Sequence, residues 1–198
     1  TAAGIEMNEC RLLEEGNRAH FMTRRFDRDG NQKLHAQSLC GLMHLDFNMP
    51  YVHSYDQYLR TVLGLRLGAD ALEQAWARCA FNIAIVNCDD HTKNLGFLMD
   101  SSGQWRLAPA YDTCFAHNPG EGKWTRWHQM QVGGKKWEIS AEDLLQLAKT
   151  YDIRRARERL QQIREAVARW PDFAATTGVG EAEIQRIAAL QPGWAKQG

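Results

Sequence analysis

Two aspartates and an asparagine in the middle of the chain have the types and spacing for joint chemistry. Asp89 and Asn94 lie five positions apart in a polar stretch, and Asp112 follows after a segment with the pattern of a short hairpin. Apolar runs flank the stretch at residues 81–86 and 107–111. Phosphoryl transfer needs one carboxylate that faces the attacking hydroxyl, together with an amide oxygen and a second carboxylate that hold Mg²⁺. The arrangement therefore favours a phosphoryl-transfer site.

Two other interpretations of these residues are open. Aspartate and asparagine also serve as ordinary capping and turn residues. A hydrolytic metal site could instead combine histidines and acids from the same region: His91, His117, His128, Asp89, Asp90 and Asp112. The chain has neither a His-x-x-x-His nor a His-Glu-x-x-His motif, and the spacings match no common zinc site. The sequence thus favours phosphoryl transfer over metal-dependent hydrolysis.

A long helix is expected to lead into the polar stretch. Between residues 69 and 86, apolar side chains recur at steps of three and four, namely Leu72, Trp76, Cys79, Ile83 and Val86. This periodicity is typical of a helix, and its last turn is apolar on nearly all sides, so the helix should be central and buried. Residues 95–99 and 104–107 then read as two strands joined by a turn. This hairpin would bring Asp112 back toward Asn94.

The flanking regions follow simpler patterns. Alternating residues predict an N-terminal hairpin with strands at 5–13 and 19–26, followed by a turn at 27–31. Helical periodicity occurs at residues 36–47, 54–65, 141–148, 153–167 and about 180–190. Ser140 and Asp143 resemble a capping box that opens the third of these helices. Residues 115–136 are irregular, and a loop of this length is usually functional or mobile.

The composition is that of an ordinary soluble globular domain. The chain has 198 residues, of which 44% are hydrophobic, and its 24 basic and 24 acidic side chains give no net charge. Global charge therefore provides no argument for binding to nucleic acid or to a membrane. No apolar run approaches the length of a membrane span. Five scattered cysteines without a Cys-x-x-Cys motif indicate reduced, mostly buried thiols, so we expect a cytoplasmic protein.

Three motifs, taken in order, resemble the HipA-type serine/threonine kinases, the toxins of bacterial toxin–antitoxin pairs. They are Arg25-Phe26-Asp27-Arg28, Asn87-x-Asp89-x-His91-x-Lys93-Asn94 and Leu107-Ala108-Pro109-Ala110-Tyr111-Asp112. Their order and spacing both agree with that family, and the resemblance covers most of the chain. Three motifs in the right order are far more specific than any one of them alone.

This resemblance implies a fold. It would be an α+β, mainly helical fold, a kinase-like C-terminal lobe with a short N-terminal β-hairpin. Residues 1–198 would form one HipA-like C-terminal kinase domain. Within it, residues 1–28 would be the tail of the N-terminal lobe and the hinge, and residues 29–198 the helical C-terminal lobe.

The resemblance also implies roles for particular residues. Asp89 would be the catalytic base, with His91 and Lys93 of the same motif ordering the loop or touching phosphate. Asn94 and Asp112 would hold Mg²⁺ on the phosphates of ATP. The main chain at Arg24, Arg25 and Phe26 would resemble the hinge that meets the adenine ring of ATP.

Substrate and partner follow from the same resemblance. In this family the substrate is a protein, in known cases an aminoacyl-tRNA synthetase. The partner is a small DNA-binding antitoxin, so any contact with DNA would be indirect and made through the antitoxin. No membrane partner is implied.

One feature departs from the family pattern. No glycine-rich phosphate loop precedes residue 27, and no lysine precedes Lys33. We therefore expect the ATP-covering N-terminal lobe to be absent from these 198 residues. Two hypotheses follow: the chain is the C-terminal lobe of an active kinase, or it is a catalytically inactive kinase-like module that contacts an antitoxin or a separate N-terminal lobe.

A cluster of basic and aromatic side chains lies in and just after the irregular segment. It comprises Lys123, Trp124, Arg126, Trp127, Lys135, Lys136 and Trp137. Such a cluster could bind a protein, could bind nucleic acid by stacking and phosphate contacts, or could pack as a wall against the helices. It lies where a kinase activation loop would be, which favours docking of a protein substrate.

Overall fold

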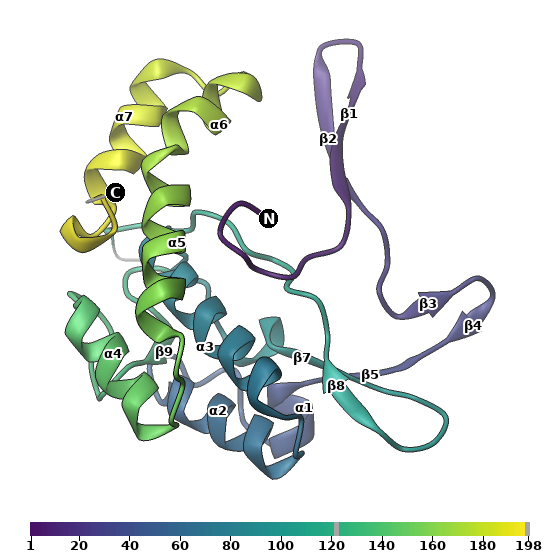
Figure 1. Cartoon of the computed structure of the whole chain (residues 1–198). Coiled ribbons are helices and arrows are strands. Elements are labelled where there is room, and N and C mark those ends of the chain that lie inside the picture. Colours follow the sequence, from purple (N-terminus) through teal and green to yellow (C-terminus); the bar gives the residue numbers. More distant parts are fainter. Residues whose placement is uncertain (121–122, 197–198) are drawn as a thin grey trace.

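The computed structural model describes residues 1–120 and 123–196. Helices predominate over short strands in these ranges, so the expectation of an α+β, mainly helical fold is confirmed (Figure 1). The helices gather on one side of the molecule, and the N-terminal strands extend from the other (Figure 1). None of the described helices is both long enough and apolar enough to span a lipid bilayer.

The first two strands form the expected hairpin, but they are shifted along the chain. β1 (Cys10–Glu15) pairs antiparallel with β2 (Arg18–Thr23), and every residue of both strands is exposed. Ile5 is buried in the core instead, and the main-chain N–H of Ala110 donates to the carbonyl of Glu6 at 2.8 Å. The expected strand at 5–13 was therefore wrong in its first half, because that half pairs with a distant segment.

The expected helix at residues 36–47 was largely wrong. β3 (Arg28–Asp29) and β4 (Gln32–Lys33) form a small hairpin at the predicted turn, and β5 (His35–Ser38) is a strand. Only α1 (Leu39–Met43) is helical, and it ends at His44, whose φ is 53°. Strand pairing of β5 outweighed the local helical pattern.

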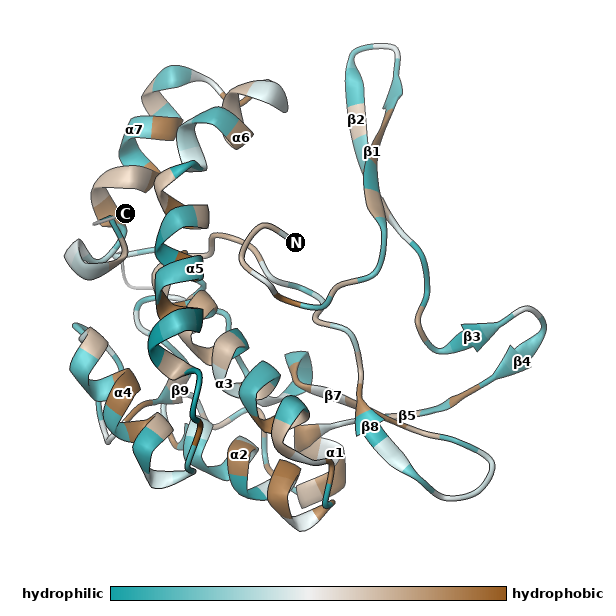
Figure 2. Ribbon diagram, viewed as in Figure 1, coloured by the Kyte–Doolittle hydropathy of each residue, from teal (hydrophilic) through white to brown (hydrophobic). Residues whose placement is uncertain are grey.

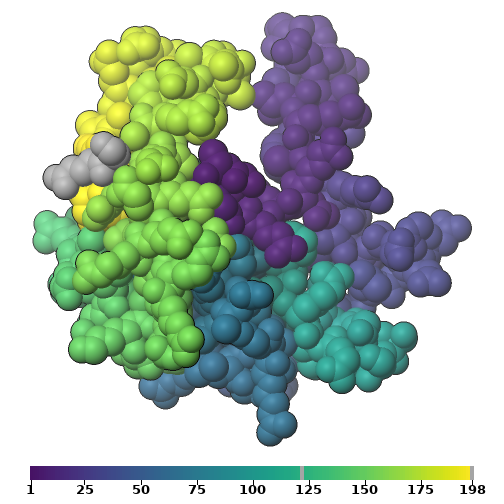
Figure 3. Space-filling model, in the orientation of Figure 1, coloured from purple at the N-terminus to yellow at the C-terminus, as the bar shows by residue number. Residues whose placement is uncertain are grey.

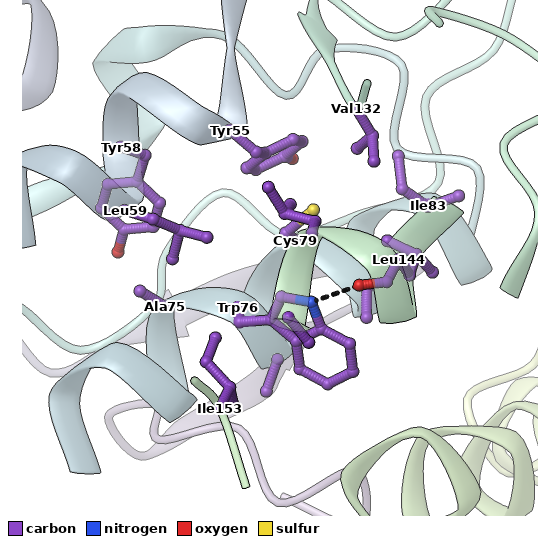
Figure 4. Close-up of a cluster of buried hydrophobic side chains, with 14 of the residues drawn as sticks. Tyr55, Tyr58, Leu59, Ala75, Trp76, Cys79, Ile83, Val132, Leu144 and Ile153 are labelled. Atoms are coloured by element: carbon purple, nitrogen blue, oxygen red, sulfur yellow. Dashed lines mark hydrogen bonds between the residues drawn. The ribbon is translucent and has the colours of Figure 1, made fainter. Parts of the chain in front are cut away.

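The two helices that carry the core agree with the sequence analysis. α2 (Tyr55–Gly64) and α3 (Ala69–Ala84) lie within two residues of their expected bounds. Figure 4 shows their inward side chains packed together, with the indole N–H of Trp76 donating to the carbonyl of Leu144 at 2.9 Å. The predicted stripe is buried throughout, in Leu72, Trp76, Cys79, Ile83 and Val86.

The cysteine thiols are mostly buried, as expected. All five are free: Cys40, Cys79 and Cys88 are buried, and Cys10 and Cys114 are exposed.

A three-stranded antiparallel sheet lies beside the polar stretch. β7 (Gly96–Met99) is its central strand, between β5 and β8 (Trp105–Leu107), so the expected hairpin is confirmed. The short 3₁₀ helix η1 (Thr92–Asn94) leads into β7. A Cβ at Gly96 would lie 2.9 Å from Cε1 of Tyr111, so a glycine is needed for this ring to rest on the strand.

A two-residue parallel bridge ties the irregular segment to the helical core. β6 (His53–Ser54) immediately precedes α2, and it pairs with β9 (Met130–Gln131). The bridge places the segment around residues 123–137 next to the start of α2.

The last third of the chain is helical, as expected, with one addition. Its elements are α4 (Ala141–Thr150), α5 (Ala156–Ala168), α6 (Trp170–Thr176), α7 (Glu181–Leu190) and η2 (Gly193–Ala195). Hydrophilic residues cover the outer side of α5 (Figure 2), and the N-terminal segment lies against this helix (Figure 3). The sequence analysis missed α6, because seven residues are too short for a clear periodic pattern.

The start of α4 provides a stability prediction. The Oγ of Ser140 accepts the main-chain N–H of Asp143 at 3.2 Å, and Oδ2 of Asp143 accepts the main-chain N–H of Ser140 at 2.8 Å. Ser140→Ala leaves a helix-terminal N–H without its acceptor, so it should lower the free energy of unfolding by about 1 kcal/mol. Urea denaturation measures this, with Ser101→Ala in the exposed β7–β8 turn as the matched control. An equal loss in both variants would argue against the capping role.

Candidate functional site

The polar stretch begins at a strained turn directly after α3. Val86 has a φ of 57°, a left-handed conformation that is rare for a β-branched residue. Hydrogen bonds from both sides hold the turn: the main-chain N–H of Cys88 donates to the carbonyl of Ala116 at 2.8 Å, and that of Ala116 to the carbonyl of Val86 at 3.2 Å. Strain of this kind persists only where the surroundings fix it. The turn at Val86 sets the direction in which the next residues leave α3.

Asp89 and Asn94 are brought together by this loop. The Nδ2 of Asn94 donates to the main-chain carbonyl of Asp89 at 3.1 Å, which leaves Oδ1 of Asn94 as its remaining polar atom. The side chain of Asp89 is 41% exposed, and Nε2 of His91 lies 3.7 Å from its Oδ1. Partial burial raises the pKa of Asp89; the nearby His91 opposes this rise, and the charge of Asp112 adds to it.

Asp112 lies on the other side of the same site. It too is left-handed, with a φ of 53°, and its main-chain carbonyl accepts from Nδ2 of Asn87 at 3.4 Å. The Oη of Tyr111 donates to the carbonyl of Lys93 at 2.6 Å and ties the two loops together. Asp112 and Asp89 are therefore held near each other, from segments more than twenty residues apart.

A large cavity lies beside Asp112. It has a volume of about 770 Å³, and Arg24, Arg25, Phe26 and Asp112 are among its lining residues. Its wall is otherwise mainly apolar or small: Met7, Phe21, Ala36, Gly96, Phe97 and Ala110 contribute. A cavity of this size and lining suits a ligand with a planar apolar part and a polar end.

The predicted site residues thus divide into two groups. Arg24, Arg25, Phe26 and Asp112 line the cavity. Asp89, His91, Lys93 and Asn94 lie on the adjoining loop and are not among the residues that line it. The roles assigned to them stay predictions.

The segment expected to act as a hinge is partly occupied by contacts within the chain. The main-chain N–H of Arg24 donates to the carbonyl of Glu9 at 3.0 Å, and its carbonyl accepts from Nδ2 of Asn8 at 2.8 Å. Arg25 directs its guanidinium at Asp27, with Nε at 2.8 Å and Nη2 at 2.6 Å. Within this segment, the main-chain N–H and C=O groups of Arg25 and Phe26 form no hydrogen bond with any described residue.

The paired hydrogen bonds from Arg25 to Asp27 change the pKa of Asp27. The hydrogen bonds from Arg25 lower the pKa of Asp27 to about 2, and the charge of Arg28 contributes in the same direction. The guanidinium of Arg25 is therefore committed to a local carboxylate.

Lys93 contacts an aromatic ring that is not part of the cavity wall. Its ammonium lies 4.1 Å from the centre of the Phe47 ring, a cation–π contact. The side chain is exposed at the surface of the loop.

A buried polar network behind the loop was missed by the sequence analysis. Asp90, adjacent to Asp89, is 1% exposed and accepts three hydrogen bonds. They come from the Oη of Tyr55 at 2.8 Å, the Nδ1 of His128 at 3.2 Å and the main-chain N–H of Gln129 at 2.7 Å. Asp90 therefore joins the loop, α2 and the segment that precedes β9.

Two asparagines extend this network to the loop that carries Asp112. Nδ2 of Asn82 donates to the Oη of Tyr55 at 3.0 Å, and Nδ2 of Asn87 donates to Oδ1 of Asn82 at 3.1 Å. The same Nδ2 of Asn87 reaches the carbonyl of Asp112. The available signal in the sequence was the presence of two asparagines in and after an otherwise apolar run, where unpaired amides would be costly.

The histidines give no support to the hydrolase interpretation. His128 is buried against Asp90, and His117 stacks on Trp137 with ring centres 5.0 Å apart. Within residues 1–120 and 123–196, no three His, Cys, Asp or Glu side chains come together as a metal site.

The basic and aromatic cluster is built from stacked pairs. Arg126 and Lys136 lie over the Trp127 ring at 4.6 and 4.1 Å from its centre, and Lys123 lies over Trp124 at 4.5 Å. Trp124 is 40% exposed. The cluster therefore presents cations and one large aromatic side chain to its surroundings.

The sequence model of the family described as HipA-like C-terminal domain matches residues 1–170. No curated protein matches the sequence. The fold is similar to that of a chain in a complex described as the Shewanella oneidensis MR-1 toxin–antitoxin system HipA, HipB and its operator DNA.

The structural similarity has a TM-score of 0.70 at 16% sequence identity. It covers 99% of this chain and 52% of the other, so this sequence spans about half the length of that relative. At this identity the match establishes the fold alone, whereas the family match extends over most of the sequence. The chain therefore belongs to the family of HipA-like C-terminal domains.

Proposed function

We propose that this chain is the C-terminal lobe of a HipA-like serine/threonine kinase, which transfers the γ-phosphoryl group of ATP to a protein hydroxyl. The observation that carries the proposal is the convergence of Asp89, Asn94 and Asp112 beside the 770 Å³ cavity. These are the groups that phosphoryl transfer needs, a carboxylate for the hydroxyl and two oxygen ligands for the metal.

Asp89 would orient the attacking hydroxyl. Its side chain is 41% exposed, so a substrate can reach it. The hydrogen bond from Nδ2 of Asn94 to the main-chain carbonyl of Asp89 fixes the loop, and the carboxylate of Asp89 would accept the hydroxyl proton. Phe26 and the apolar wall of the cavity would hold the adenine ring.

Asn94 and Asp112 fit a Mg²⁺ site. Burial raises the pKa of Asp89, and the charge of Asp112 adds to the rise; neither carboxylate forms an ion pair with a lysine or arginine in the described ranges. Mg²⁺ is usually held by one or two protein oxygens, with phosphate and water completing its shell. When bound, it would neutralise phosphate charge and align the γ-phosphoryl group.

The family to which the chain belongs also suggests its partners. The structural relative was solved with HipB and operator DNA. For this chain we propose a small DNA-binding antitoxin as partner, with DNA contacted through it, and an aminoacyl-tRNA synthetase as protein substrate. The five free cysteines are compatible with a cytoplasmic location.

One observation favours a second candidate function, a catalytically inactive module that contacts an antitoxin or a separate N-terminal lobe. The main-chain N–H and carbonyl of Arg24 and the guanidinium of Arg25 are engaged within the chain, so the hinge offers few groups to a nucleotide.

Calorimetry of Mg-ATP binding separates the two functions. We expect binding by the longest natural chain that contains this sequence, and weaker binding by the 198 residues alone. Asp112→Asn in the longer chain should weaken Mg-ATP binding by roughly tenfold or more and leave Mg-free ATP binding unchanged. Failure of both chains to bind Mg-ATP would favour the inactive module.

A further inference from the structure

Four large apolar side chains are exposed from the last residue of α1 to the start of β6. Met43, Phe47, Met49 and Val52 are between 38% and 54% exposed, and we call residues 43–52 the apolar loop. Single exposed apolar residues are ordinary, but several in ten residues mark an interaction site. The proposed roles of the nucleotide site use none of them.

The apolar loop touches the loop at residues 87–94, which we call the catalytic loop because it carries Asp89. The ammonium of Lys93 rests on the Phe47 ring at 4.1 Å from its centre, and its charge is near enough to Asp89 to favour the ionised form of that carboxyl group. A chain segment that lies on Phe47 would therefore have Asp89 within its reach.

Tyr51 joins the apolar loop to the basic and aromatic cluster. Its Oη donates to the carbonyl of Lys123 at 2.6 Å, and its own carbonyl accepts from Nε2 of Gln131 at 2.5 Å. Its ring meets Trp127 edge to face, with centres 5.5 Å apart. The apolar loop, the catalytic loop and the cluster thus form one continuous surface.

Four basic side chains lie on this surface. Lys93, Lys123, Arg126 and Lys136 form no ion pair with any described residue, and each stacks on an aromatic ring instead. Asp46 is the one acid in the apolar loop, and its Oδ1 accepts the main-chain N–H of Asn48. Unpaired cations beside exposed apolar groups complement a partner that is both apolar and acidic.

The chemistry favours a protein over a nucleic acid. Bases bind single-stranded sites by stacking on open aromatic faces. Here Trp127 already carries Arg126 and Lys136, and Trp124 carries Lys123. Methionine side chains, by contrast, adapt to varied apolar partners and are common at protein-binding surfaces.

We propose that the apolar loop and the basic cluster dock a segment of the protein substrate in which a large apolar side chain lies near acidic residues. The apolar side chain would bind at Met43, Met49 and Val52, and the acidic residues would face Arg126 and Lys136. The docked segment would then present its hydroxyl to Asp89. This inference rests on the proposed kinase function, because that function makes the occupant a substrate.

Binding of a serine-centred peptide library tests the surface without nucleotide. Each set of fluorescent peptides has one residue type fixed at one position and mixed residues at the others. The affinity of each set for the chain is measured by fluorescence anisotropy. The apolar set has a large apolar residue at the fixed position. We expect the tightest binding for peptides with a large apolar or an acidic residue fixed. Met49→Ser should weaken binding of the apolar set by roughly tenfold, because it removes buried apolar contact. Arg126→Glu should abolish the preference for acidic residues.

Matched controls are Leu63→Gln, which is 51% exposed on α2, and Arg154→Glu, which is 87% exposed near α5. Both should bind every set as the unaltered chain does. Equal binding of all sets, or unchanged preferences in Met49→Ser and Arg126→Glu, would overturn the proposal. Tighter binding of a mixed-sequence single-stranded RNA, weakened only by Arg126→Glu, would overturn it in favour of nucleic acid.

The same test distinguishes failure of the surface from failure of the proposed function. Selective peptide binding in a protein that transfers no phosphate would support the docking surface and leave the inactive module as the function. Phosphate transfer to a generic substrate, with no effect of Met49→Ser or Arg126→Glu on substrate KM, would retain the kinase and reject the surface.

Discussion

Asp89→Asn is expected to slow phosphoryl transfer by about 10²- to 10⁴-fold, the usual contribution of a positioned acid or base. Asparagine has the shape of aspartate but cannot accept the hydroxyl proton. The main-chain carbonyl that Asn94 contacts is unchanged, and the side chain is 41% exposed, so the fold should persist. The measurement is kcat at saturating Mg-ATP in the longest natural chain that contains this sequence, with the thermal midpoint recorded alongside.

The control is Asp152→Asn. Asp152 is 85% exposed and has a φ of 50°, a conformation that asparagine tolerates well. Its kcat should equal that of the unaltered protein. Full activity in Asp89→Asn would remove Asp89 from the mechanism, whereas equal losses in both variants would point to a general defect of the fold.

Elements with strong local patterns were predicted well from the sequence. α2, α3, α4 and α5 each carry an apolar stripe at helical spacing, and α2 and α4 also begin at a capping serine. These signals act over a few residues, so they need no knowledge of the rest of the chain. The β7–β8 hairpin was predictable for the same reason.

Elements decided by distant contacts were not predicted. Residues 36–38 read as the start of a helix, but they pair with β7, about sixty positions away. Ile5 read as part of the hairpin, but it packs into the core formed around α3. Tertiary pairing overrides local propensity in such cases.

In the candidate site, too, features set by local spacing were predicted and features set by distant contacts were not. The spacing of Asp89, Asn94 and Asp112 identified residues that the fold does bring together. The partners of Asp90 lie 35, 38 and 39 positions from it, so no local pattern could find them. The main-chain contacts of Arg24 with Asn8 and Glu9 also join residues that are far apart along the chain, and they were hidden for the same reason.

Asp90→Ala is expected to lower the free energy of unfolding by about 3–5 kcal/mol, the range for removing one member of a buried charged network. It would leave the Oη of Tyr55, the Nδ1 of His128 and the main-chain N–H of Gln129 without their acceptor in buried surroundings. Burial, together with the charge of Asp90, raises the pKa of Tyr55 well above its ordinary value, so Tyr55 is a donor throughout the accessible pH range. Urea denaturation provides the measurement.

Tyr55→Phe is the matched comparison, because it removes one donor and leaves Asp90 with two. It should cost about 1–2 kcal/mol, and the double variant should cost less than the sum, since both changes break the same bond. Strict additivity, or a cost below about 1 kcal/mol for Asp90→Ala, would contradict the network.

Hydrogen exchange shows whether this network positions the site as well as stabilising the fold. Asp90 is the side chain that ties residues 128–129 to the loop at 87–94, whereas α3 is linked to it only through Asn82 and Tyr55 and is otherwise packed in the apolar core. In Asp90→Ala, protection should therefore fall first in residues 128–132 and in the loop at 87–94, while α3 stays protected. Uniform loss of protection would mean that Asp90 supports only global stability. Selective loss, with kcat reduced at a temperature where the variant is fully folded, would mean that it holds Asp89 in place.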